Sequence, residues 1–180
     1  MEIKEILYKS IEKHDEYIVS DISQGKSSEI IKTIQQECSD QLDRIIGNKS
    51  EILGTFAEGF VHYLLTIALI PSQRKININN IYVDISIPDV KTLNTSPQDA
   101  LVISFPKVDD VSKIKARLEE VSTIQPIKEN IWFVLENEKD LGIRTYAIKN
   151  DGMFPFSNII SDIIGFLTNK KQSNLKLFRV

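Results

Sequence analysis

Two carboxylates stand in segments that are otherwise apolar. Glu58 lies in a predicted helix that becomes apolar on all sides, and Asp84 interrupts the β-branched strand Ile81–Ile87. An acid within such a strand is disfavoured by strand propensity and by burial, so it needs a reason. In one interpretation, Asp84 shares the solvent-facing side of a half-buried strand with Tyr82 and Ser86. In the other, Asp84 and Glu58 bind a divalent metal ion, because hard cations prefer carboxylate oxygens.

Other residues near these two carboxylates offer further chemistry. Asp89 follows Pro88 at a strand end and Asp99 begins a strand, so each is held in reserve as a metal ligand, with a turn or cap role as the alternative. His62 lies four residues after Glu58 on the same helical face, and we expect a hydrogen bond between them within the core, with a catalytic pair as the alternative. A zinc site is not expected, because the chain has only 2 His and 1 Cys.

The helices that must position these residues are indicated by apolar stripes at helical spacing. A third helix is expected to begin at Ser50 as its N-cap and to end at Pro71. It should lie centrally, with a sheet on one side and the first two helices on the other. Further helices are predicted over residues 2–20, 27–46, 111–121 and 159–167.

The strands are indicated by a change to period two and by compact apolar runs. Residues 76–87 predict one or two strands with a turn at Asn79–Asn80, and further strands are expected over 100–105, 131–135, 143–148 and 175–180. The segment 143–148 is predicted to be the hairpin partner of 131–135. The strand–helix–strand order of residues 100–135 implies a parallel crossover, and therefore a mixed sheet flanked by helices.

The length and composition indicate one α/β domain. The chain has 180 residues and a net charge of −3, which excludes a global basic field of the kind found in nucleic-acid coat proteins. We expect residues 1–48 to form a helical pair that packs on a core of residues 49–180. The single cysteine, Cys38, and the absence of an apolar leader favour the cytoplasm. No apolar run approaches the ~20 residues that span a bilayer, so no membrane partner is expected.

The order of these elements and acids resembles the PD-(D/E)xK nuclease superfamily over roughly residues 50–150. The resemblance is carried by Gly54, Glu58, Asp84, the strand and loop 100–107, and the helix that holds Lys113 and Arg117. It implies a restriction-endonuclease-like fold and hydrolysis of phosphodiester bonds in nucleic acid. It also implies Mg²⁺ or Mn²⁺ held by Asp84 and Glu58, with Asp99 as an additional ligand.

The chain departs from the family pattern in the catalytic strand. Ser104 stands where the family has an acid, and Pro106 stands where it has a lysine. Lys107 can supply the catalytic lysine only if Pro106 makes a bulge, because adjacent strand residues point to opposite faces. Alternatively, Lys113 or Arg117 on the next helix reaches into the site in its place. The expected catalytic residues are therefore Glu58, Asp84 and Lys107.

Basic residues and the N-terminal helices are the candidate surfaces for binding partners. Basic residues beside the predicted site are expected to bind nucleic acid: Lys113, Arg117, Arg74 and Lys75. As an alternative function, the chain is a non-catalytic interaction module on the same fold. In that case the two N-terminal helices mediate protein interaction or a homodimer.

Overall fold

Three long helices open the chain in the computed structural model, which describes residues 2–149 and 152–177. Their amphipathic stripes bury isoleucine and leucine side chains, as predicted. The third helix is apolar on nearly every side. The three helices are α1 (Ile3–Ser23), α2 (Ser27–Arg44) and α3 (Lys49–Ile67).

A five-stranded mixed sheet follows, in the spatial order β1-β2-β3-β4-β5. The first three strands are antiparallel neighbours, whereas β3, β4 and β5 are parallel. Asn79 and Asn80 form the predicted turn between β1 and β2, both with positive φ. The strands are β1 (Gln73–Ile78), β2 (Ile81–Ile87), β3 (Leu101–Ser104), β4 (Ile131–Leu135) and β5 (Arg144–Ala147).

Shorter helices connect the strands and a long one ends the described chain. The sequence did not predict α4. Single 3-10 turns cover Pro97–Asp99, Lys128–Asn130 and Phe156–Asn158. The remaining helices are α4 (Val90–Thr95), α5 (Val111–Ser122) and α6 (Ile159–Leu177).

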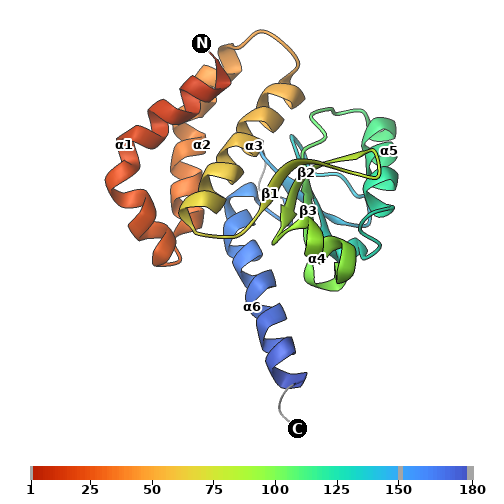
Figure 1. The fold of residues 1–180 in the computed structure, drawn as a ribbon. Coiled ribbons are helices and arrows are strands. Elements are labelled where there is room, and N and C mark those ends of the chain that lie inside the picture. The colour runs from red at the N-terminus through yellow and green to blue at the C-terminus, as the bar shows by residue number, and fades with distance from the viewer. Residues whose placement is uncertain (1, 150–151, 178–180) are drawn as a thin grey trace.

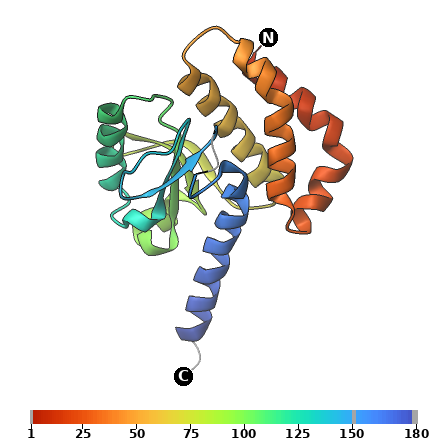
Figure 2. The same ribbon diagram turned by 180° about the vertical axis from the view of Figure 1, so that it is seen from behind.

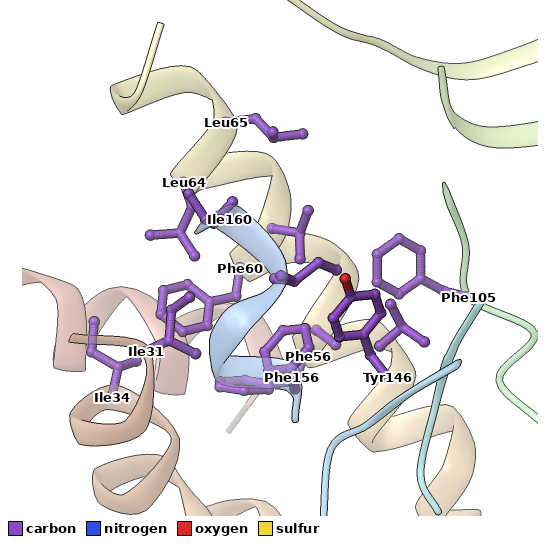
Figure 3. Packing of buried hydrophobic residues seen from close by; sticks show 14 of the residues in the cluster. Ile31, Ile34, Phe56, Phe60, Leu64, Leu65, Phe105, Tyr146, Phe156 and Ile160 are labelled. Carbon is purple, nitrogen blue, oxygen red and sulfur yellow. The ribbon is translucent and has the colours of Figure 1, made fainter. Parts of the chain in front are cut away.

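The sheet separates two layers of helices (Figures 1 and 2). One face packs against α3 and α6, with α1 and α2 outside them, and the other face packs against α4 and α5. Figure 3 shows the centre of the first layer, where Phe56 and Phe60 of α3 meet Ile31 of α2 and Phe156. This core fixes α3 across the sheet, and α3 carries one of the two candidate carboxylates.

Three predicted features of the fold are wrong. Ser50 is not the N-cap of α3, because Asn48 takes that position and accepts the Glu51 backbone N–H at 3.1 Å. The segment β5 is parallel to β4 instead of forming a hairpin with it. The predicted edge strand over 175–180 is helical up to Leu177, and residues 178–180 lie outside the described residues.

The stripes of α1 and α2 are used within the chain. They pack against each other and against α3 in one continuous hydrophobic cluster. The division into a helical pair (1–48) and a core (49–180) stays a prediction, as does a homodimer through these helices. No helix in the described part of the chain is long and apolar enough to cross a membrane.

Candidate active site

Charged side chains from four elements line one cavity of about 540 Å³. Both candidate carboxylates face it, Glu58 from α3 and Asp84 from β2, although each is almost fully buried. The cavity lies where β2 and the segment after β3 pass between α3 and α5. Its other charged and aromatic lining residues are Lys75, Tyr82, Phe105, Lys107, Lys113, Arg117 and Glu120.

Asp84 is held by the end of the neighbouring strand. Its Oδ2 accepts a hydrogen bond from the Ser104 hydroxyl at 2.8 Å and another from the Phe105 backbone N–H at 2.9 Å. Burial raises the pKa of Asp84, and these two hydrogen bonds oppose that rise. Within the described residues Oδ1 has no hydrogen-bond donor, so this oxygen is available to a ligand.

Glu58 is paired with two cations. The Lys107 ammonium donates to Oε2 at 2.6 Å, and the Arg74 guanidinium lies 3.7 Å from Oε1, too far for a hydrogen bond. Only 7% of the Glu58 side chain is exposed, so its charge depends on these partners. The predicted Glu58–His62 hydrogen bond is absent from the described residues, and His62 Nδ1 is buried without a partner.

Lys107 reaches the cavity through a turn that follows β3. The strand ends at Ser104, and Lys107 has a φ of +59°, a left-handed conformation that redirects the chain. Its side chain then crosses α3 at Gly54, where an added Cβ would lie only 2.7 Å from Lys107 Cγ. Gly54 precedes Glu58 by one helical turn, so the glycine leaves the space through which Lys107 reaches the carboxylate.

Arg117 occupies the α5 side of the cavity. Its Nε donates to the Ser104 hydroxyl at 3.3 Å, its Nη2 donates to the Tyr82 carbonyl, and Nη2 also lies 3.9 Å from Asp84 Oδ2. The side chain is only 17% exposed. The position where the family has a strand acid is therefore filled by a neutral hydroxyl that bridges Asp84 and Arg117.

The structure gathers most, but not all, of the residues expected at the site. Lys75 and Lys113 line the same cavity, whereas Arg74 borders a neighbouring one. Asp99 lies at the other end of β3 from Ser104, on the order of 15 Å away along an extended strand. Asp89 is the N-cap of α4, accepting the Thr92 backbone N–H at 2.6 Å.

Glu120 is a cavity residue that the sequence analysis missed. It follows Arg117 by three residues on α5, and its Oε2 pairs with Arg117 Nη1 at 3.2 Å. An exposed glutamate on an amphipathic helix is typical of a solvated face, which hid its position. The spacing from Arg117, an expected site residue on the same helix, is the signal that could have found it.

The donor set of the cavity suits a hard divalent cation. Among the described residues, no three His, Cys, Asp or Glu side chains gather closely enough to enclose a metal. Magnesium is nevertheless bound by one or two carboxylates together with water and phosphate oxygens. Asp84, with its open Oδ1, and Glu58 meet that requirement. Glu120 stands as a third carboxylate on the same cavity.

Comparisons with known proteins agree with this architecture. Neither the protein-family models nor the curated proteins give a match to the sequence. Among solved structures, the chain is similar to restriction endonuclease PspGI in complex with its substrate DNA. The TM-score is 0.60, the identity 17%, and the match covers 94% of each chain. The chain therefore has a restriction-endonuclease-like fold, as the resemblance implied.

Proposed function

We propose that this chain is a metal-dependent nuclease that hydrolyses phosphodiester bonds in DNA. The observation that carries the proposal is the convergence of Asp84, Glu58 and Lys107 on one cavity, although the strand acid of the family pattern is absent. The similarity to an endonuclease whose structure contains substrate DNA supports DNA as the substrate to test first.

The two buried carboxylates are the groups that would hold the metal. Asp84 and Glu58 would bind Mg²⁺ or Mn²⁺. A bound ion would supply an activated water and would offset negative charge on the phosphate. The Ser104 hydroxyl and the Phe105 N–H fix the orientation of the Asp84 carboxylate, leaving Oδ1 toward a ligand. The end of β3 therefore orients Asp84 for metal binding, and this role does not require an acid at position 104.

The cations of the cavity provide the groups that bind phosphate. Lys107 and Arg117 sit beside the two carboxylates, and Lys75 of β1 and Lys113 of α5 line the same cavity. Their positive charges would attract the DNA backbone and stabilise the extra negative charge that develops during hydrolysis. Tyr82, which is 41% exposed and lines the cavity, offers an aromatic ring beside the phosphate path.

The test compares cleavage by the wild-type chain with cleavage by Asp84→Asn. Duplex DNA, single-stranded DNA and RNA are each incubated with Mg²⁺, with Mn²⁺ or with a chelator. We expect DNA cleavage that requires metal and that falls by at least about a hundredfold in Asp84→Asn. Asp40→Asn on the exposed face of α2 is the matched control, because it makes the same substitution far from the cavity.

Two other outcomes would reject the proposal in different ways. DNA binding without cleavage would favour the alternative, a non-catalytic module whose Ser104–Arg117 pair has replaced the strand acid. That alternative rests on a specific observation, because Arg117 already lies beside Asp84 as an internal counter-ion. If the chain neither binds nor cleaves any nucleic acid, both the nuclease and the non-catalytic nucleic-acid-binding module are rejected.

A further inference from the structure

A second cavity lies on the other side of Glu58. It has a volume of about 450 Å³ and is bounded by α1, by α3 and by the beginning of β1. The two cavities share Glu58 and Lys75, so this glutamate forms part of the wall between them. Glu58 Oε2 is taken by Lys107 on the first side, whereas Oε1 is the atom nearest Arg74, which lines only the second cavity.

Within the part of the chain that the structure describes, three buried polar atoms without a hydrogen-bond partner belong to residues that line this second cavity. They are Glu58 Oε1, His62 Nδ1 and Arg74 Nε. Buried polar groups in folded proteins are nearly always hydrogen-bonded, and each exception costs stability. Three exceptions around one cavity indicate that a polar ligand completes them. That ligand must offer both acceptors, for Arg74, and a donor, for Glu58.

The charge of the lining selects the class of ligand. Lys4 from α1, Arg74 and Lys75 face one carboxylate, Glu58, so the cavity has an excess of positive charge. Burial and the charge of Arg74 lower the pKa of His62, which keeps the imidazole neutral. An anion matches this excess, whereas a metal cation does not.

We propose that the second cavity binds a phosphoryl group that keeps one P–OH proton, either the terminal phosphate monoester of a nucleic-acid strand or inorganic phosphate. The last ionisation of a phosphate monoester has a pKa near 6, so its singly protonated form is available near neutral pH. The P–OH group can donate a hydrogen bond to Glu58 Oε1 while the other oxygens accept from Arg74 and the lysines. A phosphodiester has no P–OH proton to donate to Glu58, so the cavity discriminates against it.

The version with a nucleic-acid end rests on the proposed function, because the nucleic acid would reach the second cavity from the first. Lys75 lines both cavities, so it lies where nucleic acid passing from one to the other would meet it. Its φ of +50° is an uncommon conformation for a lysine within a β-strand. The inference also gives α1 a role in binding, through Lys4 and Tyr8.

The experiment uses the two histidines of the chain as reporters and needs neither metal nor cleavage. His62 lines the second cavity, whereas His14 hydrogen-bonds Glu37 between α1 and α2 and serves as the internal control. The imidazole Cε1–H signals are followed by NMR in the metal-free protein. The added probes are inorganic phosphate, a 5′-phosphorylated oligonucleotide, and the same oligonucleotide with a 5′-hydroxyl.

A response confined to His62 is expected with the 5′-phosphorylated oligonucleotide, with inorganic phosphate, or with both, and the pattern identifies the source of the phosphoryl group. The pKa of His62 should rise on binding, because the negative charge of the ligand offsets that of Arg74. A 5′-hydroxyl oligonucleotide that shifts His62 equally, or a His62 signal that no probe shifts, would overturn the inference.

Variants test the assigned side chains. Arg74→Gln and Lys4→Gln should each weaken the phosphoryl-dependent shift of His62 by about tenfold in affinity, since each removes a charged donor. Lys9→Gln, which changes the same charge on the exposed face of α1, should leave the affinity unchanged. Lys4 is exposed, so its replacement keeps the fold, and unchanged binding in Lys4→Gln and Arg74→Gln would refute the assignment. An inactive protein that still binds phosphate would reject the nuclease and keep this site.

Discussion

Replacement of Gly54 by alanine tests how the structure delivers Lys107 to the site. An alanine Cβ at position 54 would lie 2.7 Å from Lys107 Cγ and 3.4 Å from its Cα, so the lysine must move away from α3. Gly165→Ala on α6 is the matched control, because an added Cβ there meets nothing within 4 Å. Both changes replace a helical glycine with the best helix former.

The two variants should change stability in opposite directions. Glycine to alanine within a helix gains about 1 kcal/mol, and this gain is expected in full for Gly165→Ala. In Gly54→Ala the same gain is opposed by loss of the 2.6 Å hydrogen bond between Lys107 and Glu58. A hydrogen bond to a charged group is worth about 1.5–3 kcal/mol. Gly54→Ala should therefore be destabilised by about 0.5–2 kcal/mol, which urea unfolding measures.

Activity should follow the same geometry. A displacement of about 1 Å in a catalytic group can cost about a hundredfold in rate, so Gly54→Ala should lose about that much cleavage while Gly165→Ala keeps it. The same assay and metal conditions apply to both variants. If Gly54→Ala proves as stabilising as Gly165→Ala and retains activity, Lys107 does not cross α3 at this glycine, and its placement in the site is wrong.

Two further predictions concern the dependence of stability on pH. Burial raises the pKa of Asp84, so the stability that its protonated form contributes is lost as pH rises through the folded-state pKa. Asp84→Asn, which carries no charge, should therefore be more stable than wild type at pH 7. In urea unfolding this difference in stability should disappear below about pH 4, where Asp84 is protonated in both the folded and the unfolded state. A hydrogen bond from His14, and to a smaller extent one from Ser10, lowers the pKa of Glu37. The stability that ionised Glu37 contributes is therefore present at neutral pH and lost as pH falls through the folded-state pKa. Ser10→Ala should therefore cost about 1 kcal/mol at pH 7 and less at pH 3, and an equal cost at both pH values would contradict this.

Local patterns were sufficient for most of the elements. Period two located β1 and β2, and the two asparagines between them adopt the left-handed conformation that their type favours. The pairing of β5 was less accessible, because a short connection usually indicates a hairpin. The segment 136–143 instead returns across the sheet, and its Leu141 and Ile143 pack with the α5-side cluster, which allows parallel pairing.

The candidate site was predicted in part for a similar reason. Asp84 and Glu58 could be recognised because acids in apolar segments conflict with their surroundings. The route of Lys107 could not, since it depends on a left-handed residue after the strand and on the space above Gly54. The second cavity depends on how α1 packs against α3, a tertiary contact that no local pattern records.

The order of the strands in the sheet follows their order in the chain, and this has a consequence for engineering. Among the described residues, every charged residue that lines the first cavity comes from the continuous stretch between Glu58 and Glu120. The later described part of the chain, with β4, β5 and α6, supplies scaffold to that cavity but no charged lining residue. The exposed turn at Gly142 is thus a place where a reporter peptide can be inserted, or new termini opened, without rebuilding the chemistry.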